Sequence, residues 1–146
     1  MPYASYNATI QTKELRLDML STSDRITILD LAARYNHLMD CGDAQGWADC
    51  FTVDGIFDGG PRLQAEGHDD LVAFMERMLA RDIPARHWIN SPVIEGSGNE
   101  AHLTLYLLVV NLTAGEPHTR HLGVYHDDIM RTNKGWRFRR RRLGHL

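Results

Sequence analysis

Apolar residues follow two different spacings along this chain, and the change between them at Pro84 constrains the fold most strongly. Before Pro84 they recur mainly every three or four residues, which is typical of amphipathic helices. After Pro84 they form long runs rich in strand-forming residues, separated by turn residues. Helices followed by antiparallel strands indicate an α+β domain. We therefore expect a cone-shaped, curved antiparallel sheet that packs on N-terminal helices and encloses a pocket.

The clearest helix is predicted between Ser23, a plausible N-cap, and Gly42, a typical stop. A short helix after Asp43 and a longer one between Gly67 and Pro84 are expected to follow. Between them, Asp54-Gly55 is expected to form a turn into a short strand. The later strands are predicted at residues 86–91, 101–112, 118–131 and 136–143.

Length and charge narrow the class of protein. A chain of 146 residues with 43% apolar residues suits one domain, which we place at residues 23–146 as an α+β barrel, with residues 1–22 as an N-terminal arm. Acidic and basic residues are mixed and the net charge is −3, so neither nucleic acid nor a membrane is an expected partner. No apolar run resembles a signal peptide or a membrane span, so we expect a cytoplasmic protein.

Three proton-handling side chains stand where apolar packing or a neutral cap is expected. Asp40 lies in the last turn of the long helix, where the helix dipole disfavours a carboxylate by up to about 1 kcal/mol. His87 is a candidate partner, because a carboxylate beside an imidazole orients the ring and favours its protonated form. Tyr35 lies on the apolar stripe of the helix, from which a phenol could polarise a substrate carbonyl. Together they suggest acid/base chemistry.

Each of these residues also has a plainer interpretation. Asp40 would then be a solvated residue at a helix end, and His87 a core histidine bonded to a backbone carbonyl. Tyr35 would be an amphipathic core residue whose hydroxyl reaches water. The spacing of the three residues leaves both interpretations open.

Residues 139–142 are four consecutive arginines. Alternation along a strand sends neighbouring side chains to opposite faces, so the run splits into two pairs and does not predict a nucleic-acid patch. One face could aim Arg141 at the pocket mouth to anchor an anionic or carbonyl oxygen. Asp127 is a candidate salt-bridge partner for this run.

Three histidines of the predicted strand 118–131 invite a metal-site interpretation. Only His118 and His126 share a face with each other, and they are too far apart to chelate one ion, whereas His121 lies on the opposite face. The sequence therefore predicts no metal site.

A family resemblance is carried by motifs spread over residues 23–143: Asp24-Arg25-Ile26, Asp30-Leu31, Tyr35, Asp40, Asp43, Trp47, Phe51, Asp54-Gly55, Arg86-His87, 123–127 and 135–138. These motifs resemble those of SnoaL-like proteins in the nuclear-transport-factor-2-like superfamily. The branch in question contains scytalone dehydratase, bile-acid dehydratase and hexachlorocyclohexane dehydrochlorinase.

This resemblance implies an apolar cavity, no cofactor, and an Asp–His pair that removes a proton during elimination. Asp40 and His87 match that pair. Tyr35 matches a position that is tyrosine in the bile-acid dehydratase and lysine in the dehydrochlorinase, where it helps to bind substrate or leaving group. Arg141 lies near the family's late arginine, in a register open by one or two residues. Related proteins associate through the outer sheet, so a homodimer or homotrimer is expected.

The expected function is therefore a cofactor-independent lyase, of dehydratase type, that acts on a small hydrophobic cyclic molecule. In this interpretation Asp40, His87 and Tyr35 are catalytic, and the residues expected to contact substrate are Arg141, Tyr125, Trp88 and Phe57. Two alternatives remain: an isomerase or cyclase that uses the same base, and a noncatalytic binding or assembly module such as an oxygenase small subunit.

Overall fold

The computed structural model describes residues 19–113 and 115–145. Three helices in this part are α1 (Thr22–Cys41), α2 (Ala44–Ala48) and α3 (His68–Leu79). The strands are β1 (Phe51–Asp58), β2 (Gln64–Glu66), β3 (Ala85–Ser97), β4 (Glu100–Asn111), β5 (His118–Thr132) and β6 (Gly135–His145). Most of the expected N-terminal arm, residues 1–18, lies outside the described residues.

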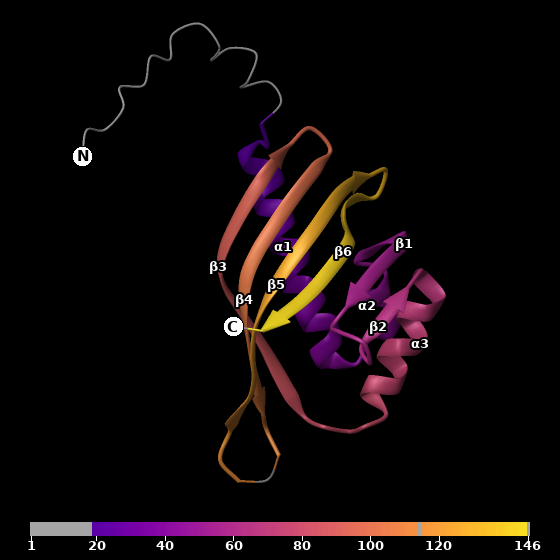
Figure 1. Cartoon of the computed structure of the whole chain (residues 1–146), viewed down its shortest axis with the longest axis vertical. Coiled ribbons are helices and arrows are strands. Elements are labelled where there is room, and N and C mark those ends of the chain that lie inside the picture. Colours follow the sequence, from indigo (N-terminus) through magenta and orange to yellow (C-terminus); the bar gives the residue numbers. More distant parts are fainter. Residues whose placement is uncertain (1–18, 114, 146) are drawn as a thin grey trace, which may run out of the picture.

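The strands form one sheet in the order β2-β1-β6-β5-β4-β3. The α+β class is confirmed, and Figure 1 shows α1 lying across one face of the sheet with α3 beside β1 and β2. The sheet differs from the expected antiparallel arrangement at one pairing, because β1 pairs parallel with β6. The expected barrel is also not closed, since β2 and β3 remain as the two edges of the described sheet.

Helix α1 begins two residues earlier than the sequence predicts. Its N-cap is Ser21, whose hydroxyl accepts from the backbone N–H of Asp24, while the Asp24 carboxylate accepts from the backbone N–H of Ser21. Asp24 also accepts from the indole N–H of Trp136 and pairs with Arg131, so it joins the start of α1 to β5 and β6. The hydrogen bond from Ser21, more than the others, lowers the pKa of Asp24 to about 2. The predicted stop is confirmed: Gly42 has φ +84° and bonds back to α1.

Two local predictions on strands differ from the structure. Asp54 and Gly55 do not turn the chain, because β1 runs through them with a register shift between Phe51 and Ile56. Strand β3 continues past the predicted end at residue 91 to Ser97, although Pro92 lies within it. A proline is tolerated there because β3 is an edge strand and shifts register between Asn90 and Val93.

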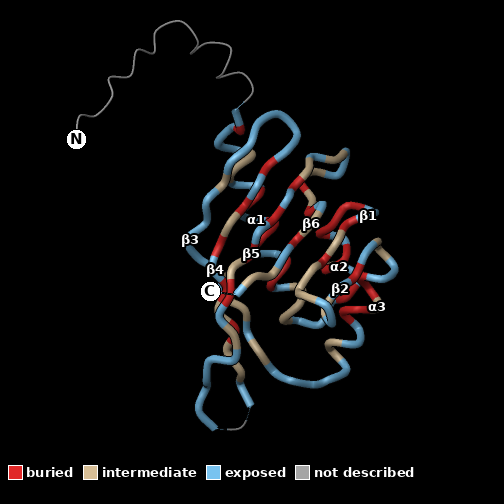
Figure 2. Tube along the Cα trace, viewed as in Figure 1, coloured by how far each residue is buried: buried red, intermediate tan, exposed pale blue. Residues whose placement is uncertain are grey.

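The core lies between the helices and the inner face of the sheet. Along β4, alternate residues are buried from Ala101 to Val109, as a strand with one covered face requires (Figure 2). Aromatic rings fill the side of the core near α2 and β1, where Trp47 packs 5.2 Å from Phe51 and 5.8 Å from Phe57 between ring centroids. No helix of the described residues is long and apolar enough to cross a membrane.

Candidate active site

The end of α1 and the start of β3 bring Asp40 and His87 into direct contact. Asp40 Oδ1 lies 2.6 Å from His87 Nδ1, and the backbone N–H of His87 donates to Asp40 Oδ2 at 3.2 Å. The side chains are 14% and 17% exposed, respectively. An ionised carboxylate can only accept, so Nδ1 carries the proton of this contact. The pairing predicted from the sequence is confirmed as geometry, and the position of Asp40 at a helix C-terminus is compensated by two donors.

This pair faces a cavity of about 710 Å³ between the helices and the inner face of the sheet. Asp40 and His87 both line it, together with mostly apolar side chains from α1, α3 and the sheet. Phe57 and Tyr125, both expected to contact substrate, also line the cavity. The volume lies in the range of small-molecule sites.

Tyr35 lines the same cavity, about 1.4 helical turns before Asp40 on α1. Its side chain is buried, and its ring packs edge-on to Tyr125 with centroids 6.2 Å apart. Burial raises the pKa of both phenols above their ordinary value. Both therefore remain protonated at neutral pH, and a phenol in that form can donate a hydrogen bond to a substrate oxygen.

The expectation that Arg141 points to the pocket mouth is wrong. Arg141 is fully buried, and its Nε and Nη2 donate to the two carboxylate oxygens of Asp127 at 2.8 and 2.7 Å. Its guanidinium lies 4.3 Å from the ring centroid of Tyr35 and 4.1 Å from that of Tyr125, and it does not line the cavity. Burial lowers the pKa of Arg141, but the charge and hydrogen bonds of Asp127 together with the nearby Tyr35 and Tyr125 phenols outweigh burial, so the pKa is raised.

Register explains the position of Arg141. Asp127 faces the interior from β5 and pairs directly with Arg141 across β5 and β6. The β5–β6 register shifts between Asp128 and Ile129, so that Arg139 becomes an extra residue in β6. Arg141 therefore supports the rings of Tyr35 and Tyr125 from behind, where it can position them without touching a ligand.

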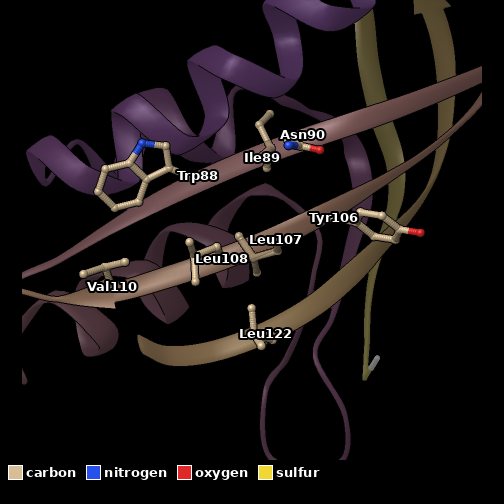
Figure 3. Close-up of a pocket in the computed structure, with 8 residues that line it drawn as sticks. All are labelled: Trp88, Ile89, Asn90, Tyr106, Leu107, Leu108, Val110 and Leu122. Atoms are coloured by element: carbon tan, nitrogen blue, oxygen red, sulfur yellow. The ribbon is translucent and has the colours of Figure 1, made fainter. Parts of the chain in front are cut away.

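Trp88 does not lie at the cavity either, because it follows His87 on β3 and so points to the other face of the sheet. There it joins an apolar groove of about 520 Å³ with Tyr106 and Leu122, and Figure 3 shows these side chains on three neighbouring strands. All three are slightly more than half exposed.

Self-association of the chain stays a prediction, and we expect it on this face of the sheet because its apolar side chains are exposed. A monomer in sedimentation equilibrium would contradict it.

The cavity is also lined by polar residues that the sequence analysis does not place there: Arg81, Asp82 and Arg86 around the start of β3, and Arg120, His121 and His145 on β5 and β6. From the sequence, His121 suggests only a possible metal ligand. Its alternation with Tyr125, four residues later on β5, was the available signal that it faces inward. In the described part of the chain, no group of three or more metal-ligating side chains comes together.

Residues 21–142 match the model of the SnoaL-like domain. The chain belongs to the SnoaL-like domain family. This SnoaL-like chain is 29% identical to a protein of unknown function from Mycobacterium tuberculosis, with a TM-score of 0.78 over 83% of this chain and 70% of the other. It is 26% identical to a nuclear-transport-factor-2-like protein with a cystatin-like fold from Novosphingobium aromaticivorans, with a TM-score of 0.78 over 91% and 86%.

A candidate scytalone dehydratase from Novosphingobium aromaticivorans shares the fold, at 20% identity and a TM-score of 0.71 over 84% of this SnoaL-like chain and 87% of the other. No curated protein matches the chain. SnoaL-like domains include polyketide cyclases and dehydratases. These likenesses establish the family and the fold.

Proposed function

We propose that this SnoaL-like protein is a cofactor-independent lyase that eliminates water from a small hydrophobic cyclic substrate. The observation that carries the proposal is the contact of 2.6 Å between Asp40 and His87 at the wall of a largely apolar cavity. A carboxylate that accepts a hydrogen bond from Nδ1–H keeps the proton on Nδ1 and leaves the lone pair of Nε2 free in the neutral ring. That nitrogen is the base of the proposed reaction.

The proposed step begins when His87 Nε2 removes a proton from a substrate carbon beside a carbonyl group. The electrons of the broken C–H bond form the new carbon–carbon double bond, and the C–O bond of the neighbouring carbon breaks. The departing hydroxide takes the proton from His87 and leaves as water, which returns the imidazole to its neutral state. Asp40 orients the ring and stabilises its transient positive charge.

The phenols of Tyr35 and Tyr125 supply hydrogen bonds in this proposal. Because burial raises the pKa of both, they remain donors at neutral pH and can stabilise the oxyanion that develops on the substrate carbonyl. Arg141 is enclosed behind their rings, so we now assign it a positioning role in place of direct substrate binding.

An isomerase or cyclase is the nearest alternative, since the same base followed by reprotonation moves a double bond or closes a ring. The noncatalytic module is less well supported. It predicts a cavity filled by side chains and an Asp40 beyond hydrogen-bond reach of His87, whereas the cavity is open and the two residues are in contact.

Mass spectrometry separates these reactions. We expect purified protein, incubated with a panel of cyclic β-hydroxy ketones, to convert at least one of them to a product lighter by one water molecule. A product of unchanged mass would favour the isomerase or cyclase. Unchanged substrates across the panel, with binding intact, would argue for the noncatalytic module.

A further inference from the structure

We infer that Arg120, His121 and His145 form a second polar site in the cavity, which binds an anionic oxygen group of the ligand such as a carboxylate or a phenolate. This oxyanion site, defined by these three residues, lies on β5 and β6, whereas Asp40 and His87 enter from α1 and β3. The inference rests on the proposed function in that it takes the cavity as the substrate site.

The local backbone directs Arg120 into the cavity. The β4–β5 register shifts between Val109, which pairs with His121, and Val110, which pairs with Thr119. Arg120 is therefore the extra residue of a β-bulge, and bulges next to binding sites redirect side chains. Regular alternation would send Arg120 and His121 to opposite faces, yet both line the cavity.

The surroundings of the His121 imidazole indicate which of its two nitrogens can donate a hydrogen bond. Its Nε2 is enclosed and has no hydrogen-bond partner among the described residues. The ring packs over Gly123, where an added Cβ would lie only 2.8 Å from Nε2, so a side chain at residue 123 would displace the ring. A buried N–H without an acceptor is unfavourable, so the proton of the neutral ring belongs on Nδ1, which is not enclosed in this way.

The surroundings of this ring are positive. The ring of His145 lies 5.9 Å from that of His121 between centroids, and Arg120 is adjacent in sequence. Burial, then His145 and Arg120, lower the pKa of His121. Among the residues that the structure describes, no carboxylate lies within ion-pair distance of any of the three. An anionic ligand group would supply the missing negative charge and an acceptor for the Nδ1–H of His121.

The register of the sheet also sets the spacing between the two polar sites. His87 pairs with Val109 across β3 and β4, and Val109 pairs with His121 across β4 and β5. Two strand spacings separate His87 from His121, which is roughly 10 Å, with the apolar side chain of Val109 between them. The substrate class that fits is a ring compound, about two fused rings long, with its reacting carbon at one end and an anionic oxygen group at the other.

Isothermal titration calorimetry with 2-naphthoate and its uncharged counterpart 2-naphthamide tests this site. We expect the wild-type protein to bind the naphthoate about tenfold more tightly, the effect of one charge-assisted hydrogen bond. Arg120→Gln and His121→Leu should each remove most of this preference. Arg86→Gln is the matched control, because Arg86 also lines the cavity but on β3, and its removal changes the net charge equally.

Equal affinity for the two probes, no binding of either, or an equal loss in Arg86→Gln would overturn the site. The measurement requires no turnover, so its outcome is independent of the lyase proposal. A protein that prefers naphthoate but converts no hydroxy ketone retains the oxyanion site without the proposed reaction. A protein that eliminates water without this preference has the reaction without the site.

Discussion

Asp40→Asn and His87→Ala are each expected to lower turnover about 10²–10⁴-fold while leaving the protein folded. The alanine at residue 87 removes the base. The asparagine at residue 40 keeps the shape of the side chain but loses the charge that holds the imidazole proton on Nδ1 and stabilises the imidazolium. The measurement is kcat for the eliminated product, with circular dichroism and the urea midpoint as checks on folding.

The double variant tests whether Asp40 and His87 act on turnover as one pair or independently of each other. Because the carboxylate acts through the imidazole, Asp40→Asn combined with His87→Ala should be no slower than His87→Ala alone. His102→Ala is the matched control, since His102 Nδ1 lies 2.8 Å from Asp128 Oδ1 in an exposed pair on the other face of the sheet. Wild-type turnover in either Asp40→Asn or His87→Ala, or an equal loss in His102→Ala, would exclude the assignment.

Arg141→Met is expected to destabilise the fold by about 3–5 kcal/mol, because it leaves the carboxylate of Asp127 buried without its partner. Replacing both residues, as Arg141→Met with Asp127→Leu, should recover much of this loss, since no buried charge then remains. The measurement is the free energy of unfolding in urea, compared in a double-mutant cycle.

Arg139→Met provides the control for this cycle. Arg139 is 61% exposed and its Nη1 lies 4.0 Å from Glu100 Oε1, so we expect its replacement to change the free energy of unfolding by no more than about 0.5 kcal/mol. Similar losses in Arg139→Met and Arg141→Met would contradict the distinction between a buried and a solvated arginine. A double variant less stable than Arg141→Met would show that the ion pair is not the cause.

Much of this site could be predicted from local rules. The periodicity of apolar residues places Asp40 at the end of a helix, and a carboxylate there requires a compensating donor, which is His87. Alternation along β3 would also have excluded Trp88 from the cavity, because His87 faces it.

Other features depend on pairing between distant strands, which local patterns do not contain. The shift that makes Arg120 an extra residue in β5 exists only relative to β4, and the shift before Arg141 exists only relative to β5. The parallel contact of β1 with β6 likewise joins segments more than eighty residues apart. These pairings decide which arginine lines the cavity and which packs behind the aromatic rings.

The most direct measurement of the central claim is the ¹⁵N spectrum of the His87 imidazole in the wild-type protein and in Asp40→Asn. In the neutral ring of the wild type, we predict a proton on Nδ1, hydrogen-bonded to Asp40, and an unprotonated Nε2 whose signal moves when 2-naphthoate enters the cavity. The contradicting result is a neutral ring with its proton on Nε2, unchanged by Asp40→Asn and by the bound ligand. That result would show that Asp40 does not keep the His87 proton on Nδ1, and hence that it does not leave Nε2 free to act as the base.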